Sequence, residues 1–239
     1  MSRTRSASQW EFLRARIAPD GYMGLHLTIG ALALAGALFL FGQIAEGVMN
    51  ADRITILDLQ VSQWFHARAT PPLTQFMLLV TRLHSTAGIL ALCLLLGWRW
   101  VRTRSWDWLV TLVLTVPVGM LLNLFLKNLF QRARPSFQDP LLTLTSYSFP
   151  SGHTAAATLF YGVLAAYLVC RVKSWPWRAF VVCLAVALVA LVGLSRIYLG
   201  AHYLSDVLAA VAASGGWLVF SLTAAGTWRR RRIMQRAGD

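Results

Sequence analysis

Long apolar stretches separated by short charged segments constrain this chain more than any other feature. Of its 239 residues, 57% are hydrophobic and only 13% are charged, whereas about a quarter are charged in a typical soluble domain. A membrane-spanning helix needs about 20 mostly apolar residues. The stretches that meet this requirement lie near 23–45, 85–101, 107–127, 153–171, 177–195 and 204–226. The sequence therefore predicts an all-α polytopic membrane protein with six transmembrane helices.

The remaining segments complete a single predicted domain over 1–239. Region 45–84 has the pattern of one or two short interfacial helices, and Pro71 and Pro72 are expected to open the second. The apolar run after residues 1–22 is too long for a cleavable signal peptide. Segment 1–22 fits either a short amphipathic helix or a flexible tail, and 227–239 is expected to be a basic tail.

The distribution of Lys and Arg predicts the orientation in the membrane. Most of these residues cluster in 1–22, 99–104, 171–178 and 227–239, which alternate with the predicted helices. Cytoplasmic loops carry such an excess. Tryptophans typical of an interfacial belt gather at the same ends: Trp98, Trp100, Trp106, Trp108, Trp175, Trp177 and Trp228. We expect a bacterial inner-membrane protein with both termini in the cytoplasm.

The net charge of +13 does not indicate a nucleic-acid partner, because the basic residues lie in short clusters between apolar runs rather than along one face. The expected partners are membrane lipids. Cys93, Cys170 and Cys183 form no CxxC pair and are interpreted as buried small apolar side chains.

A second group of charges lies at the opposite, extracytoplasmic ends of the predicted helices. Lys127, Arg134 and Arg196 supply a point charge and two planar forks suited to phosphate oxygens. Pro135 favours a loop at Arg134. Ser151 and Gly152 precede a long helix, whose free N–H groups form an anion site. These residues are predicted to bind phosphate.

Two histidines and one carboxylate accompany these cations. His202 and Asp206 are spaced to share a helical face, so that the carboxylate can orient the imidazole as a nucleophile. His153 has no carboxylate at helical spacing and is better placed as a general acid. No metal or other cofactor is expected, because Asp139 and Asp206 are too few carboxylates for a two-metal site.

The three groups together resemble the motifs of the type 2 phosphatidic acid phosphatase (PAP2) superfamily. The matching positions are Lys127-x6-Arg134-Pro135, Pro150-Ser151-Gly152-His153 and Ser195-Arg196-x5-His202-x3-Asp206, within a motif core at 127–206. The resemblance implies six spans, an extracytoplasmic site and metal-independent dephosphorylation of a lipid phosphate through a phosphohistidine. It also implies that Lys127, Arg134, Ser151, Gly152 and Arg196 bind phosphate, that His202 is the nucleophile oriented by Asp206, and that His153 is the general acid. Substrates known for bacterial relatives are phosphatidylglycerophosphate, phosphatidic acid, undecaprenyl pyrophosphate and lipid A.

Two other functions remain compatible with the sequence: a lipid transporter or flippase, and a non-catalytic lipid-binding protein. Several residues also receive a structural interpretation. Arg132 is expected to face lipid, and Asp58 to lie on a helix surface or cap a helix. Residues interpreted as rim or belt positions are Asp139, Tyr147, Phe149, Tyr198 and Tyr203, and those interpreted as interfacial or packed histidines are His26, His66 and His84.

Overall fold

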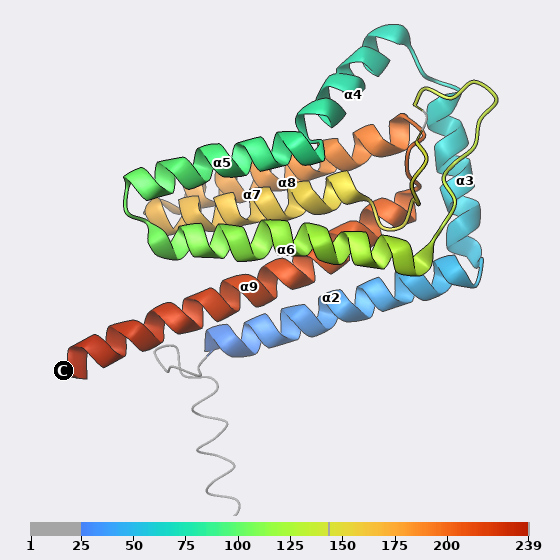
Figure 1. Ribbon diagram of the computed structural model, residues 1–239. Coiled ribbons are helices and arrows are strands. Elements are labelled where there is room, and N and C mark those ends of the chain that lie inside the picture. The colour runs from blue at the N-terminus through green and yellow to red at the C-terminus, as the bar shows by residue number, and fades with distance from the viewer. Residues whose placement is uncertain (1–24, 143, 239) are drawn as a thin grey trace, which may run out of the picture.

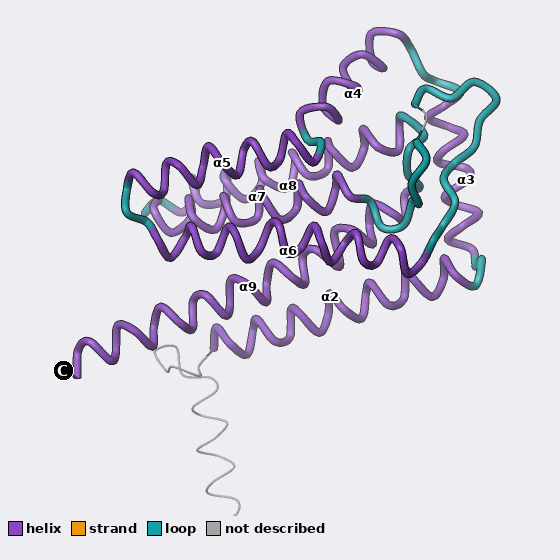
Figure 2. The backbone as a smooth tube through the Cα atoms, viewed as in Figure 1, coloured by secondary structure: helices purple, strands orange, loops and turns teal. Residues whose placement is uncertain are grey.

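The computed structural model describes residues 25–142 and 144–238, and over these residues all regular structure is helical (Figures 1 and 2). The helices are α2 (Leu25–Met49), α3 (Arg53–His66), α4 (Pro71–Leu83), α5 (Thr86–Arg102), α6 (Trp106–Phe130), α7 (Gly152–Arg171), α8 (Trp175–Tyr198) and α9 (Leu204–Gly238). The predicted all-α membrane fold is confirmed. Segment 1–22 and the side chain of His26 lie outside the described residues.

Five of these helices are long and apolar enough to cross a membrane alone: α2, α6, α7, α8 and α9. The predicted second span is α5, whose 17 residues extend only about 26 Å against a hydrocarbon core of about 30 Å. Helix α5 is long enough to cross a membrane only together with α4, and the two helices are bent by 53° relative to each other. The described chain therefore provides five spans, or six if the bent pair counts as one.

Helix α7 lies at the centre of the bundle. It packs against α5, α6, α8 and α9, while α2 runs along α9 (Figure 1). Its buried Ala155, Ala156 and Ala157 permit the close helix approach that stabilises packing in lipid. The apolar core beside α7 includes Val116 and Leu159.

Helices α3 and α4 lie outside this bundle, and α3 stands across one end of it (Figure 1). Pro71 opens α4 as predicted. Tyr198 of α8 holds the start of α4, because its hydroxyl accepts the Thr70 N–H at 3.0 Å and bonds the Thr74 hydroxyl at 3.0 Å. Tyr198 is 2% exposed, so its interpretation as a rim residue was wrong.

Helix α9 is longer than the predicted last span, and the interfacial interpretation of one tryptophan was wrong. Helix α9 continues through the Arg229–Arg232 run to Gly238, because arginine and glutamine are good helix formers and nothing in 227–238 breaks the helix. Trp100 is fully buried against Trp108 and Tyr167 and does not belong to an interfacial belt.

The end of the bundle beside α3 brings together segments that are distant in sequence. Because successive helices run in opposite directions, the C-terminal ends of α6 and α8 meet the N-terminal ends of α7 and α9 there. Gln131 ends α6 in a left-handed conformation, with φ of 47°. The loop that follows passes α3 and returns to α7 (Figure 2).

Candidate active site

A cavity of about 510 Å³ opens at this end of the bundle. Its polar lining consists of Thr86, Asn123, Lys127, Arg134, Ser146, Gly152, His153, Arg196 and His202. Its apolar lining consists of Leu90, Pro117, Met120, Leu121, Leu124 and Leu144, from α5, α6 and the loop after α6. A cavity with one cationic region and one apolar region suits a molecule that carries both an anionic group and a hydrocarbon chain.

The three predicted phosphate ligands reach this cavity from different segments. Lys127 lies in the last turn of α6, Arg134 in the following loop and Arg196 in the last turn of α8. Arg134 is held by the loop, since its Nε donates to the Ser146 carbonyl at 2.6 Å and a terminal nitrogen to the Tyr147 carbonyl at 3.0 Å. The structure thus gathers three cations around one space.

Arg196 is anchored from α4. It is 2% exposed, and one terminal nitrogen donates to the Thr81 hydroxyl. Thr81 could not be identified from the sequence, because a threonine in an amphipathic helix carries no signal of such a contact.

Ser151 is the one predicted phosphate ligand that does not line the cavity. It occupies the position before α7, where its N–H donates to the Asp206 carbonyl at 3.0 Å and its hydroxyl pairs with that of Thr154 at 3.0 Å. Gly152 does line the cavity. A Cβ at Gly152 would lie 4.0 Å from Lys127 Nζ, so the missing side chain leaves room beside the helix N-terminus.

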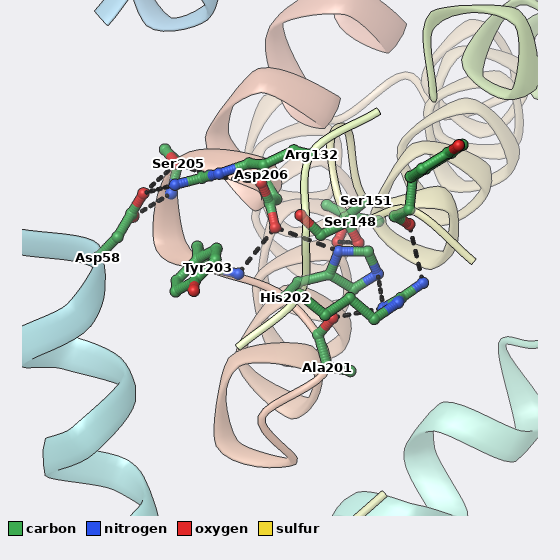
Figure 3. Close-up of polar contacts among 12 residues, drawn as sticks. Asp58, Arg132, Ser148, Ser151, Ala201, His202, Tyr203, Ser205 and Asp206 are labelled. Carbon is green, nitrogen blue, oxygen red and sulfur yellow. Dashed lines mark hydrogen bonds and ion pairs between the residues drawn. The ribbon is translucent and has the colours of Figure 1, made fainter. Parts of the chain in front are cut away.

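His202 and Asp206 meet, although not as the sequence analysis expected. His202 lies in the turn before α9, so the two residues share no helical face. Asp206, in the first turn, accepts the Tyr203 N–H at 2.9 Å through Oδ2. The same oxygen lies 3.4 Å from His202 Nδ1 (Figure 3). The chain folds back through this Asp206 contact and brings carboxylate and imidazole together.

The contacts of His202 indicate which nitrogen carries its proton. Nε2 lies 3.3 Å from a terminal nitrogen of Arg134, and a guanidinium can only donate. We therefore assign Nε2 as the acceptor and the proton to Nδ1, which lies 3.4 Å from Asp206 Oδ2. Burial lowers the pKa of His202 to about 4, although Asp206 raises it. The imidazole is neutral at neutral pH, with a lone pair on Nε2.

His153 lies in the first turn of α7 and lines the same cavity as His202. His84 and His66 lie elsewhere and are packed, as interpreted from the sequence. His84 bonds the Val80 carbonyl and the Tyr161 hydroxyl, and His66 stacks on Phe137.

Behind His202 lies an ionic cluster that the sequence analysis missed. Arg132 pairs with Asp206 at 2.7 Å and with Asp58 of α3 at 2.8 Å (Figure 3). Burial lowers the pKa of Arg132, but the two carboxylates raise it more, so that the net shift is upward. The expectation of a lipid-facing Arg132 was wrong, because its guanidinium pairs with two buried carboxylates. Asp58 does not lie on a helix surface, but it accepts the Ser205 N–H in the first turn of α9, which agrees with the alternative that it caps a helix. The signals were a lone acid in α3 and a second arginine within the first motif, two residues before Arg134. Asp139 is exposed in the loop after α6.

Comparisons with known proteins point to one family. Residues 108–230 match the model of the PAP2 superfamily. Phosphatidylglycerophosphatase B of Bacillus subtilis is 33% identical over 205 residues, which cover 84% of this chain and 98% of the relative. Lipid A 1-phosphatase of Rhizobium etli is 37% identical over 135 residues, about half of each chain. Undecaprenyl-diphosphatase of Sulfolobus acidocaldarius is 32% identical over 117 residues, again about half of each.

Two solved structures resemble the fold. The transmembrane PAP2 type phosphatidylglycerolphosphate phosphatase from Bacillus subtilis matches with a TM-score of 0.69 and 31% identity, over 80% of this chain and 94% of that one. Aquifex aeolicus LpxE matches with a TM-score of 0.56 and 24% identity, over 70% of this chain and 94% of that one, which supports the fold alone. With a family model that covers half of its length and a relative aligned almost end to end, the chain belongs to the PAP2 superfamily.

Proposed function

We propose that this protein is a lipid phosphatase that removes a phosphate group from a lipid or isoprenoid (pyro)phosphate through a phosphohistidine on His202. The observation that carries the proposal is the orientation of His202. Its Nδ1 faces Asp206, and its Nε2 lies beside Arg134 at a cavity that Lys127 and Arg196 also line. A neutral imidazole with its lone pair directed at a cationic cavity is arranged for attack on a bound phosphate.

The reaction proceeds in two steps. His202 Nε2 attacks phosphorus while the bond to the leaving oxygen breaks, and His153 donates its proton to that oxygen. A water molecule then gives a proton to His153 and attacks the phosphorus. The N–P bond breaks, which restores His202 and releases inorganic phosphate. The three cations and the N–H groups at the start of α7 stabilise the charge on the phosphoryl oxygens throughout.

Phosphatidylglycerophosphate is the first substrate to test. The relative whose length is matched almost completely, over 84% of this chain, is named a phosphatidylglycerophosphatase. The apolar part of the cavity, between α5 and α6, provides room for a hydrocarbon chain beside the cations. Phosphatidic acid, undecaprenyl pyrophosphate and lipid A form the comparison panel.

The proposal includes independence from metal ions. Over the described residues, no three His, Cys, Asp or Glu side chains cluster as a metal site requires. The positive charge comes instead from Lys127, Arg134 and Arg196. Activity should persist in excess chelator, whereas reversible loss in chelator would contradict this part of the proposal.

The proposed location is a bacterial inner membrane, with the cavity on the extracytoplasmic side and both termini in the cytoplasm. The uneven distribution of Lys and Arg supports this orientation. A substrate in the outer leaflet would then reach the cavity while its tails remain in lipid.

The decisive experiment measures phosphate release and phosphoenzyme trapping on detergent-solubilised protein. His202→Ala should abolish both. His153→Ala should release little phosphate from lipid substrates, but should still form a phosphoenzyme from an activated ester whose leaving group needs no proton. His66→Ala removes a histidine outside the cavity and serves as the control. A phosphoenzyme on the His202→Ala protein would overturn the assignment.

A further inference from the structure

The cluster behind His202 contains an arginine that bridges two buried carboxylates. One terminal nitrogen of Arg132 donates to Asp206 Oδ1 at 2.7 Å, and the other donates to Asp58 Oδ2 at 2.8 Å. Asp58 and Asp206 are 1% and 0% exposed. A buried carboxylate is costly unless it is paired and hydrogen-bonded. Arg132 therefore compensates both acids at once.

The two oxygens of Asp206 have different partners. Oδ1 accepts from Arg132, whereas Oδ2 accepts the Tyr203 N–H and faces His202 Nδ1. With Oδ1 held from the far side, the carboxylate cannot rotate away from the imidazole. Arg132 thus acts on His202 through Asp206. The Arg132 guanidinium also lies 4.3 Å above the Tyr203 ring, and this contact fixes the plane of the guanidinium.

Asp58 connects this arrangement to α3. Its Oδ1 accepts the Ser205 N–H at 2.8 Å, and its Oδ2 accepts the Ser205 hydroxyl. The Ser205 N–H belongs to the first turn of α9, where helix N–H groups lack partners within the helix. A carboxylate is favourable there. Asp58 therefore fixes both Arg132 and the first turn of α9, which carries Asp206 (Figure 3).

We propose that Asp58 and Arg132 are positioning residues, which hold Asp206 in the orientation that keeps the His202 proton on Nδ1 and the Nε2 lone pair facing the cavity. This inference rests on the proposed role of His202 as nucleophile. Neither residue lines the cavity, so neither is expected to touch phosphate. Because a small misplacement of a reacting group is costly, loss of this pair should lower kcat about 10- to 100-fold.

The test uses Asp58→Asn and Arg132→Lys, which preserve size or charge but break the double bridge. Both variants should lower kcat by that factor and leave KM within about threefold, because phosphate binding is untouched. ¹⁵N NMR of the imidazole should show the single Nδ1–H tautomer in the wild type and a mixture in the variants. The double variant should cost little more than either single one, since the two residues act as a unit.

Arg68→Lys is the matched control. Arg68 is exposed beside Trp64 and makes no contact with this cluster, so its kcat and tautomer should equal those of the wild type. Unchanged kcat in folded Asp58 and Arg132 variants, or an effect on KM alone, would refute the positioning role. A wild-type tautomer with the proton on Nε2 would refute it as well, even if a variant fails to fold.

The same measurements separate this inference from the proposed function. If His202→Ala is inactive while the Asp58 and Arg132 variants are fully active, only the positioning role fails. If the wild type releases no phosphate from any lipid phosphate, the proposed function fails, whereas the NMR tautomer still reports whether the pair orients His202.

Discussion

His202 is the residue on which most of the proposed chemistry depends, and burial decides its protonation state. The side chain is 1% exposed. Removal from water disfavours the imidazolium, and the neighbouring Arg134 and Arg196 add to this effect, while Asp206 opposes it. The balance leaves a neutral imidazole beside a carboxylate that would otherwise favour protonation.

The pKa of His202 can be measured directly. Because its pKa is lowered to about 4, the imidazole should show no protonation between pH 8 and pH 5.5 in an NMR titration of the labelled protein. In Asp206→Asn the carboxylate that raises the pKa is gone, so protonation should shift to still lower pH. Titration of His202 near 6.5, the ordinary histidine value, would contradict this account of the site.

Thr81 is a second residue whose effect can be isolated. Thr81→Val keeps the shape of the side chain but removes the hydroxyl that accepts from Arg196. A hydrogen bond to a charged group contributes about 1.5–3 kcal/mol, so binding of inorganic phosphate as an inhibitor should weaken about 10- to 100-fold. Thr103→Val, at the opposite end of α5, is the control. Equal phosphate affinity in the two variants would show that Thr81 does not support Arg196.

At the scale of elements, the turn between α8 and α9 places His202, the proposed nucleophile. Gly200 has φ of +65°, and a Cβ there would lie 2.8 Å from the Phe137 ring. The next residue, Ala201, accepts a hydrogen bond from Arg134 through its carbonyl, and His202 follows. The conformation of Gly200 therefore links the loop after α6 to the position of the imidazole.

Substitution of Gly200 should affect both folding and activity. Gly200→Ala adds a steric cost of about 1–2 kcal/mol for the left-handed conformation and a clash with Phe137. We expect a lower thermal midpoint in detergent and reduced phosphate release. Gly215→Ala is the matched control, because a Cβ at that position meets nothing within 4 Å. A Gly200→Ala protein as stable and active as the control would show that the turn adapts freely.

At the scale of the whole molecule, the antiparallel order of the helices places the cationic cavity at one end of the bundle and the basic loops at the other. Lys127, Arg134 and Arg196 line the cavity at one end, whereas Arg99, Arg102 and the Arg229–Arg232 run lie at the opposite end. Under the orientation that we propose, the second group is the one that meets the cytoplasm.

Cysteine labelling tests this orientation. In a background with Cys93, Cys170 and Cys183 replaced by alanine, Asp139→Cys should react with a membrane-impermeant maleimide in intact spheroplasts. Lys173→Cys, in the α7–α8 loop at the other end, should react only after permeabilisation. Both positions are exposed, so access to the reagent depends on the side of the membrane alone. The reverse labelling pattern would invert the proposed topology.

The sequence by itself determined the helices, their order and the end of the bundle at which the motif charges meet. These properties are local, because each stretch of backbone in lipid must satisfy its hydrogen bonds within its own helix, and apolar length reports this directly. Boundaries that depend on packing were less accurate, as the bent α4–α5 pair and the extension of α9 show.

Only the tertiary structure decided which charged residues line the cavity and which pair with one another behind His202. Arg132 and Arg134 are two residues apart, yet Arg134 lines the cavity and Arg132 pairs with Asp58 and Asp206, each 74 residues from it along the chain. Ser151 turns from the cavity toward Asp206 and Thr154 for the same reason. Buried polar groups choose the nearest partners in space, and that proximity is set by helix packing, which sequence spacing does not encode.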